Sequence, residues 1–501
     1  MTIEFFQPDG QDTERVHHAR AAAGNAAVAE EAIGVLRDAL SGAAPVDRIL
    51  LKAAAGAGKS FVLKRLVADA VEHPNCVRVA IVAFTNKQIH PLATALGQTL
   101  GKDRVCLLVA KDKYDDVPDE GHAHATVVTT TPSISHECEV IISTSHKLGA
   151  IGELKRLKDH LGAAHDSGSA FDVLFVDEAW QLPHHLFDKI AKAAPITVGV
   201  GDVGQLPPLE IGANPWRGDP GFNPYRAWPT AFEGDERTWA VELPAVWRPA
   251  AGHLGLWRAF YPEWGELNCV AAPSDRALVA DGVSGPAAAI WKQVGTGVPT
   301  LLEVVGLPDA EAADIDWPLM RVVESLLDDL LSSGFTLEYA QYDEAGSPTG
   351  TTLTSCPGDH AGDPLVAILA TRNQAVYDAT DVVERLRVKH SLTETEVVAS
   401  TVDSWQGQTN RITVAIHPLT GAAQLDDFNS AFGRLAVTCT RATHGLLMVS
   451  RPGLDRLLGE APARPGTPYG EPGNRHLPRQ THQRILATFA RGTLTVDPEV
   501  A

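Results

Sequence analysis

A glycine-rich segment near the start of the chain carries residue types that bind phosphate. The stretch 53–60, Ala-Ala-Ala-Gly-Ala-Gly-Lys-Ser, follows Ile-Leu-Leu-Lys at 49–52 and precedes a helical pattern that starts at Phe61. In a strand, loop and helix of this kind, backbone N–H groups and the helix N-terminus form an anion nest. Lys59 can reach the outer phosphates of a nucleotide, and the Ser60 hydroxyl can ligate Mg²⁺. The predicted nucleotide contacts are Gly56, Ala57, Gly58, Lys59 and Ser60.

Two adjacent acids, Asp177 and Glu178, end a second buried run at 173–177. At the carboxyl edge of a parallel sheet, these carboxylates would lie beside the phosphate loop. Asp177 is predicted to share the Mg²⁺ with Ser60, and Glu178 to accept a proton from the attacking water. The alternative is a pair of solvated acids at a strand end. Taken together, the loop and the acids predict hydrolysis of a nucleoside triphosphate, with ATP and Mg²⁺ as cofactors.

Apolar runs of strand length alternate with helical patterns along the chain, which is typical of parallel sheets with crossover helices. Strands are expected at 49–53, 78–85, 105–109, 140–143, 173–177 and 196–201, and in a second set at 365–371, 396–401, 412–416 and 446–450. We therefore predict an α/β fold with two lobes. The expected division is an N-terminal lobe at 1–240, a C-terminal lobe at 241–455 with an insertion at about 268–363, and a Pro/Gly-rich tail at 456–501.

Composition restricts the class of protein. The 501 residues include 42 Lys and Arg against 62 Asp and Glu, a net charge of −20, and 44% are hydrophobic. The acidic balance argues against coating nucleic acid by bulk charge, although a local basic groove stays open. No apolar stretch approaches the ~18 residues of a membrane span. The six cysteines are scattered without a CxxC pair. We expect reduced thiols in a cytoplasmic protein without membrane association.

Several motifs after the phosphate loop resemble those of superfamily 1 helicases. Asp-Glu-Ala-x-Gln at 177–181 and Gly-Asp-x-x-Gln-Leu-Pro-Pro at 201–208 are similar to the DEAxQ branch, which includes the nonsense-mediated-decay and Okazaki-processing helicases. Further blocks that resemble family motifs lie at 83–87, 143–148, 243–248, 369–374, 400–408 and 437–442. All the blocks occur along the chain in the order that the family has. The resemblance covers residues from about 49 to 450.

The resemblance implies two RecA-like P-loop lobes with ATP in the cleft between them. The first lobe would supply Lys59, Ser60, Asp177, Glu178 and Gln205, and the second Arg248 and Arg441, with Gly407 beside the nucleotide. Gln205 would bond the γ-phosphate and report its loss. The two arginines would stabilise charge on the transferring phosphoryl group. A surface or salt-bridged arginine is the alternative for Arg441 considered alone.

The resemblance also implies a groove for one strand of DNA or RNA over the tops of both lobes. The predicted contacts are Thr85, Asn86, Thr144, His146, Thr371 and Thr401. Small hydroxyls and backbone amides at strand ends bond phosphate without reading bases, which predicts sequence-independent binding. The aromatic residues Phe84, Trp247 and Trp405 are candidates for stacking on bases, with core packing as the alternative.

The chain departs from the family pattern in three places. Ala53 stands where the loop signature has its first glycine, and Thr409 stands where the branch has an acid that serves the nucleotide sugar. No well-spaced glutamine motif precedes the P-loop, which leaves adenine selectivity open. The histidines and cysteine at 122–146 lack the spacing of a zinc finger, and we interpret them as scattered loop residues.

These observations predict a nucleic-acid-dependent ATPase, a phosphoric anhydride hydrolase that acts as a translocase or helicase on single-stranded DNA or RNA. Branch membership implies five-prime-to-three-prime movement. One alternative is a nucleic-acid-stimulated ATPase switch that does not unwind and serves as a subunit of a repair, RNA-processing or defence complex. A third hypothesis is a small-molecule kinase, but this hypothesis does not explain the second lobe.

Overall fold

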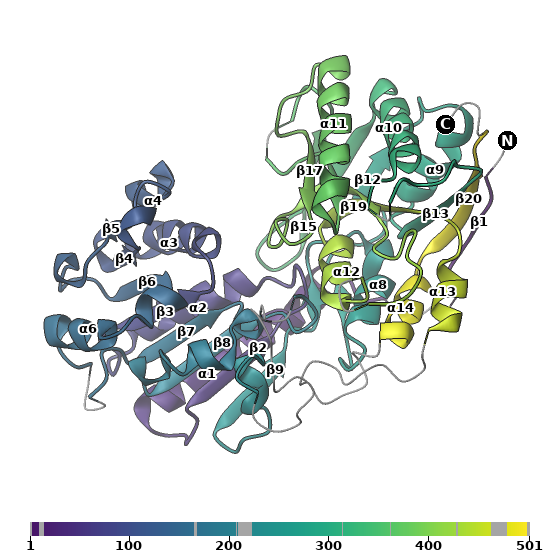
Figure 1. Ribbon diagram of the computed structural model, residues 1–501. Helices are drawn as coiled ribbons and strands as arrows, with labels where there is room; N and C mark the ends of the chain where they lie inside the picture. Colours follow the sequence, from purple (N-terminus) through teal and green to yellow (C-terminus); the bar gives the residue numbers. More distant parts are fainter. Residues whose placement is uncertain are drawn as a thin grey trace.

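The computed structural model consists of two α/β lobes, with the amino-terminal half in purple and blue and the carboxyl-terminal half in green and yellow (Figure 1). Residues 3–9, 15–164, 168–206, 208, 223–312, 314–360, 362–426, 429–461 and 478–497 are described. Pro207 of the predicted motif at 201–208 and much of the predicted tail at 456–501 lie outside these residues.

The first lobe is built on an eight-stranded sheet in the order β5-β4-β6-β3-β7-β8-β2-β9. All its neighbouring strands run parallel. The strands are β2 (Arg48–Lys52), β3 (Val79–Ala83), β4 (Val105–Leu108), β5 (Thr126–Val128), β6 (Val140–Thr144), β7 (Val173–Asp177), β8 (Ile196–Gly201) and β9 (Thr238–Glu242). The central strands are apolar on both faces because helices cover both sides.

Helices pack around this sheet. One of them, a 24-residue helix that precedes the phosphate loop, was not predicted from the sequence. The helices are α1 (His18–Ser41), α2 (Lys59–Glu72), α3 (Asn86–Leu100), α4 (Asp119–His124), α5 (Ser145–Leu148), α6 (Glu153–Leu161) and α7 (His184–Phe187). Parallel pairing aligns the carboxyl ends of the strands along one edge. This edge carries the phosphate loop after β2, the acid pair at the end of β7 and the segments after β3 and β6.

The second lobe has a seven-stranded sheet in the order β1-β20-β13-β19-β18-β16-β17. Its strands are β1 (Phe5–Phe6), β13 (Thr300–Val305), β16 (Val366–Ala370), β17 (Val397–Thr401), β18 (Asn410–Ile416), β19 (Ala442–Ser450) and β20 (Ala490–Thr495). Its helices are α8 (Leu254–Phe260), α9 (Gly285–Gly295), α10 (Trp317–Ser332), α11 (Asn373–His390), α12 (Phe432–Cys439), α13 (Leu454–Glu460) and α14 (Pro478–Leu486). Apart from the antiparallel pair of β1 and β20, the strands are parallel. The two parallel sheets confirm the predicted α/β fold class and are consistent with RecA-like lobes.

Three strands of this sheet come from residues that the sequence assigned elsewhere. β13 lies in the predicted insertion, β20 in the predicted tail and β1 in the predicted first lobe. β13 and β20 pair across about 190 residues of sequence, Thr300 with Ala490. Local periodicity carries no signal for such pairing. We therefore propose a second lobe that continues at least to Thr495.

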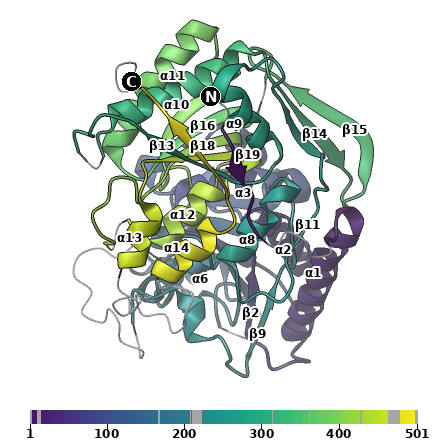
Figure 2. The ribbon, with the colours of Figure 1, turned by 90° about the vertical axis from the view of Figure 1, so that its right-hand side faces the viewer.

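Two smaller sheets accompany the two large ones. β10 (Ala245–Val246) pairs with β11 (Asn268–Cys269), and the antiparallel set is β12 (Arg276–Val279), β14 (Thr336–Tyr342) and β15 (Pro348–Ser355). The turn between β14 and β15 reaches α1, where a Cβ on Gly346 would lie 2.6 Å from that of Ala22 (Figure 2).

Alternate residues of β16 face different cores. Ala367 and Leu369 belong to the large core that also fills the first lobe, whereas Val366 and Ile368 face α10 and α11 on the other side. One face of the second sheet therefore packs continuously with the first lobe. None of the helices in the described part of the chain combines the length and the apolar character that crossing a bilayer requires.

Candidate nucleotide and nucleic-acid site

The phosphate loop has the backbone that its glycines permit. Gly56 and Gly58 have φ angles of +74° and +92°, in the left-handed region that disfavours side chains. Gly58 is the N-cap of α2, which begins at Lys59 rather than at the predicted Phe61. A Cβ on Gly56 would also collide with that of Arg248, so the position requires glycine for space as well as for conformation.

Aromatic side chains from α8 and the residue after it support the loop. The Trp257 indole N–H donates to the Ala55 carbonyl at 2.8 Å, and the Ala55 N–H donates to the Tyr261 hydroxyl at 3.1 Å. The same hydroxyl donates to Asp202 at 2.8 Å. Burial, with Asp202 beside it, raises the pKa of Tyr261, so the phenol stays protonated as a donor. The loop, the segment after β8 and α8 are therefore one hydrogen-bonded unit.

A buried asparagine on α1 completes this support. Asn25 donates from its side-chain nitrogen to the carbonyls of Ala57 and Ala245, each at 2.8 Å, and accepts the Ala245 N–H at 2.8 Å. The Trp247 N–H donates to the Gly56 carbonyl at 2.7 Å. Sequence reasoning missed Asn25, because only the fold places α1 behind the loop. A polar residue on the otherwise alanine-rich face of this helix was the available signal.

Lys59 and three carboxylates form a buried charged group. Lys59 is ion-paired with Glu178. Burial alone would lower the pKa of Lys59, but the carboxylates of Glu178, Asp202 and Asp177 outweigh it and raise the pKa. Burial, reinforced by Glu178, raises the pKa of Asp177 to about 6. Burial also raises the pKa of Asp202, against the attraction of Lys59.

The acid pair itself has an unusual backbone. Glu178 has a φ angle of +50°, and its N–H donates to the Asp177 carboxylate at 3.0 Å. This left-handed turn is costly for a residue with a side chain and is found mainly where function needs it. It ends β7 abruptly, so that both carboxylates stand at the strand end. Ser60, the other predicted magnesium ligand, is exposed at the start of α2.

Gln205 lies near this group with its side chain turned back. Its amide nitrogen donates to the carboxylate of Asp202. A Cβ on Gly433, at the start of α12, would lie 2.7 Å from the Gln205 carbonyl oxygen. The loop that carries Gln205 is therefore in contact with the second lobe, while its side chain bonds Asp202 in this structure.

Arg248 and Arg441 meet at Thr440. Arg248 donates to the Thr440 carbonyl at 3.1 Å, and Arg441 donates to the Thr440 hydroxyl at 2.9 Å and to the Gln408 carbonyl at 3.5 Å. Burial lowers the pKa of both arginines; that of Arg441, with Arg248 beside it, falls to about 9. The Nε atom of Arg441 is buried without a hydrogen-bond partner among the residues that the structure describes.

The two arginines belong to the same electrostatic group as Lys59. Asp202 attracts Lys59, Arg248 and Arg441, and Glu178 attracts all three as well. The structure thus brings together all six residues that were predicted to be catalytic. Gly407 was predicted to lie beside the nucleotide. It directly precedes Gln408, whose carbonyl accepts a hydrogen bond from Arg441. The backbone of Arg248 packs on the phosphate loop, whereas the sequence assigned this residue to the second lobe.

The six predicted nucleic-acid contacts fall into two groups, one on each sheet. In the first lobe, β3 and β6 are neighbours with Ala83 opposite Thr144, and the rings of Phe84 and His146 lie 5.3 Å apart. Thr85 is the N-cap of α3, and Asn86 is its first residue. In the second lobe, Ala370 lies opposite Thr401, so Thr371 and Thr401 lie at adjacent strand ends.

The aromatic candidates for base stacking pack against the protein. Phe84 and Trp405 are partly buried against the large core, and Trp247 packs against a small cluster of α1. Trp405 also donates to the Asn410 side chain at 3.0 Å. In the described part of the chain, no group of three His, Cys, Asp or Glu side chains is arranged to hold a metal ion.

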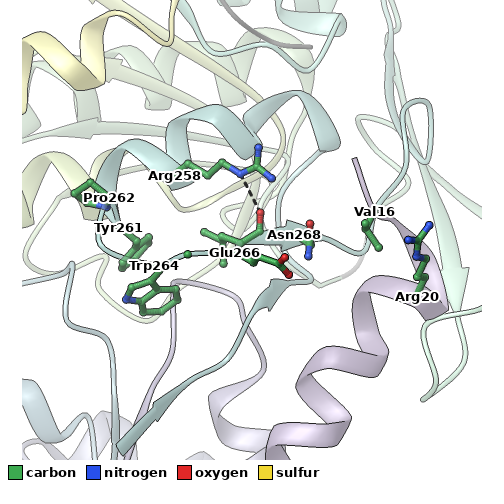
Figure 3. Close-up of a pocket in the computed structure, with 10 residues that line it drawn as sticks. Val16, Arg20, Arg258, Tyr261, Pro262, Trp264, Glu266 and Asn268 are labelled. Carbon is green, nitrogen blue, oxygen red and sulfur yellow. Dashed lines mark hydrogen bonds between the residues drawn. The ribbon is translucent and has the colours of Figure 1, made fainter. Parts of the chain in front are cut away.

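A separate cavity of about 390 Å³ lies next to the loop support (Figure 3). Tyr261 lines it together with Trp264, and their ring centroids are 4.7 Å apart. Arg258, which also lines the cavity, donates to the Leu267 carbonyl at 3.0 Å. Tyr261 therefore connects this cavity with the phosphate loop.

Residues 37–210 match the sequence model of a family described as an AAA domain, a span that includes the phosphate loop and the acid pair. Residues 53–60 have the sequence and the backbone of a P-loop. No curated protein matches it significantly. Membership of superfamily 1 and of its DEAxQ branch stays a prediction.

Solved structures with similarity to this chain include viral helicases. The helicase of PRRSV is 14% identical over 84% of this chain and 56% of its own length, with a TM-score of 0.36. The arterivirus nonstructural protein 10 helicase in complex with DNA is 14% identical over 82% of this chain and 62% of its own length, with a TM-score of 0.38. The structure of the same helicase without DNA is 14% identical over 82% of this chain and 61% of its own length, with a TM-score of 0.39. The chain thus spans about three fifths of these structures.

Proposed function

We propose that this protein is an ATP-dependent translocase or helicase that moves along single-stranded nucleic acid, in the five-prime-to-three-prime direction. The observation that carries the proposal is the buried group at the junction of the lobes, where Lys59, Glu178 and Asp202 share an electrostatic environment with Arg248 and Arg441. A lysine, two acids and two arginines next to a glycine loop form the set that phosphoryl transfer requires.

The site residues would divide the chemistry among them. The amides of residues 56–60 and the Lys59 ammonium would hold the phosphates, which requires Lys59 to leave Glu178. Glu178 would then be free to orient the attacking water and take its proton. Ser60 and Asp177 offer oxygen ligands suited to Mg²⁺, which would neutralise part of the phosphate charge. The guanidinium groups of Arg248 and Arg441 would stabilise the negative charge of the transition state.

The coupling to nucleic acid follows from the position of the arginines. Arg441 directly precedes β19 in the second lobe, whereas the backbone of Arg248 packs on the phosphate loop. A triphosphate bound by both arginines would hold the lobes together, and its hydrolysis would release them. Each lobe has its own group of strand-end contacts for a nucleic-acid backbone, so opening and closing would change the distance between the two groups. This is the motion that a translocase needs.

The deciding experiment measures ATP turnover with single-stranded DNA, single-stranded RNA, duplex or no nucleic acid, with Lys59→Ala as the inactive control. We expect stimulation by at least one single strand and little by duplex. A rate of ATP turnover that no nucleic acid changes would contradict the proposal and would favour a small-molecule kinase.

A strand-displacement assay then separates the two forms of the proposal. Partial duplexes with a five-prime or a three-prime single-stranded tail test unwinding and its polarity together. Displacement from the five-prime tail supports the helicase. Stimulated turnover without displacement or movement on either substrate would instead indicate a nucleic-acid-gated ATPase switch.

A further inference from the structure

A line of hydrogen bonds runs from the start of α3 to the predicted catalytic base. The Thr85 N–H donates to the Gln88 side-chain oxygen at 2.9 Å, and the Gln88 side-chain nitrogen donates to the Gln181 oxygen at 3.1 Å. The Gln181 nitrogen in turn donates to Glu178 Oε2 at 3.2 Å. The other carboxylate oxygen, Oε1, is the one that binds Lys59.

The end groups determine the direction of every bond in this relay. An ionised Glu178 carboxylate can only accept hydrogen bonds, so the Gln181 amide must present its nitrogen there and its oxygen to Gln88. Gln88 must therefore present its nitrogen to Gln181, which leaves its oxygen to accept a bond. The backbone N–H of Thr85 can only donate, and it occupies that oxygen. Both amides are thus held in one orientation from both ends.

The relay crosses between neighbouring strands of the first sheet. β3 and β7 are paired, and the relay joins the segment that follows β3 to the segment that follows β7. Gln181 is 8% exposed and ends the short 3₁₀ helix Ala179–Gln181, whereas Gln88 lies in the first turn of α3 and is half-buried. The buried end therefore lies at the proposed ATP site, and the solvent-facing end at the proposed nucleic-acid contacts Thr85 and Asn86.

We propose that Gln88 and Gln181 are positioning residues that make ATP turnover respond to a nucleic-acid strand bound at the start of α3. This inference rests on the proposed function and adds the route by which the two sites communicate. A backbone phosphate bound at Thr85 and Asn86 shifts the first turn of α3. Gln88 transmits the shift to Gln181, which alters how the Glu178 carboxylate divides between Lys59 and the attacking water.

The polarity of the relay provides a specific test. In Gln88→Glu, the carboxylate still accepts the Thr85 N–H, so the helix cap is kept. The introduced carboxylate cannot donate to the Gln181 side-chain oxygen. If the Gln181 amide rotated to donate to this carboxylate, its oxygen would face the Glu178 carboxylate, and two acceptors would then oppose each other. Gln88→Ala removes both bonds and serves as the second variant. Gln98→Ala, an exposed glutamine near the end of the same helix, is the matched control.

The experiment compares the ratio of turnover with and without single-stranded DNA or RNA, the dissociation constant for the strand, and the melting temperature. We expect the stimulation ratio to fall by at least about fivefold in Gln88→Glu and in Gln88→Ala, which is the lower range of coupling between sites. The strand affinity should stay within about twofold, since neither amide contacts the strand. Gln98→Ala should retain the wild-type ratio.

The outcomes distinguish this inference from the proposed function. Wild-type stimulation that survives in both Gln88 variants would overturn the relay and leave the proposed function in place. A wild-type protein whose turnover ignores nucleic acid would overturn both. If stimulation and strand affinity fall in parallel, Gln88 acts in binding rather than in positioning, and the relay is again rejected. A lower melting temperature in Gln88→Ala alone would measure the capping bond separately.

Discussion

The two halves of the candidate site handle buried charge differently. In the lysine–carboxylate group, formed by Lys59, Asp177, Glu178 and Asp202, the lysine is ion-paired with Glu178 and each acid has donors beside it. The arginine pair, Arg248 and Arg441, has only carbonyl and hydroxyl oxygens as its hydrogen-bond partners among the described residues.

This difference indicates where an anion would gain most. Two buried guanidinium groups that repel each other are costly unless negative charge compensates them. The carboxylates of Asp202 and Glu178 supply part of that charge from a distance. A triphosphate would supply the rest, and would release Lys59 from Glu178 in the process. We therefore expect substitutions in the two halves of the site to have different consequences for turnover and for nucleotide binding.

Among the variants that should keep nucleotide affinity, the largest loss of turnover is expected for the arginine pair. Arg441→Ala should lower kcat by about 10³-fold, because an arginine aimed at the transferring phosphoryl group contributes that much or more. Nucleotide affinity should change far less. Arg441→Lys should not restore the rate, since an ammonium lacks the planar fork of donors. Single-turnover rates and nucleotide dissociation constants check this; equal losses in both would indicate a binding role.

Glu178→Gln should lower kcat by about 10²- to 10³-fold, because it removes the predicted proton acceptor. It should also keep or tighten nucleotide binding, since Lys59 loses its ion-pair partner and becomes available to phosphate. Lys59→Ala is the matched variant from the other side of the same ion pair, and it should lose both turnover and nucleotide affinity. Wild-type turnover in either variant would remove that residue from the proposed mechanism.

The lysine–carboxylate group should also set an acid limit on activity. Asp177 has a pKa of about 6, so it is protonated below that pH and cannot ligate Mg²⁺ as an anion. We expect kcat/KM for MgATP to fall about tenfold per pH unit below about 6, and higher Mg²⁺ concentration to offset part of the loss. A profile of kcat/KM from pH 5 to 8 at two Mg²⁺ concentrations tests this. A profile that is flat across pH 6 would contradict the role of Asp177.

The smallest effect concerns stability. The pKa of Asp177 is higher in the folded protein than its ordinary value of 3.8, so its contribution to stability is lost as the pH rises through about 6. Asp177→Asn keeps the acceptor for the Glu178 N–H and removes the buried charge. It should raise the free energy of unfolding by about 1–3 kcal/mol at pH 8, in the absence of Mg²⁺ and nucleotide.

This gain should disappear near pH 4, where the wild-type carboxyl is protonated in both states. Denaturant unfolding at the two pH values is the measurement. Asp202→Asn is unsuitable as a control because Asp202 accepts hydrogen bonds from Tyr261 and Gln205. A variant that is no more stable than the wild type at pH 8 would show that Lys59 fully compensates the charge of Asp177.

Elements with strong local signals could be predicted from the sequence. The strands that carry the phosphate loop and the acid pair lie within a few residues of their predicted bounds. β13 and β20 were not assigned to the second sheet because they pair with each other across about 190 residues of chain. Asn25, Gln88 and Trp257 were missed for the related reason that their partners are distant in sequence.

Short-range sequence patterns are enough to predict the chemistry that the strand ends can carry, because glycine spacing, adjacent acids and buried apolar runs act over a few residues. The tertiary structure determines which of these groups share one environment. It set Arg248 on the phosphate loop, brought Arg441 to the same carboxylates and aligned Gln88 with Gln181. Such contacts depend on strand order and on the packing of the two lobes, and both result from pairing between distant segments that no local pattern encodes.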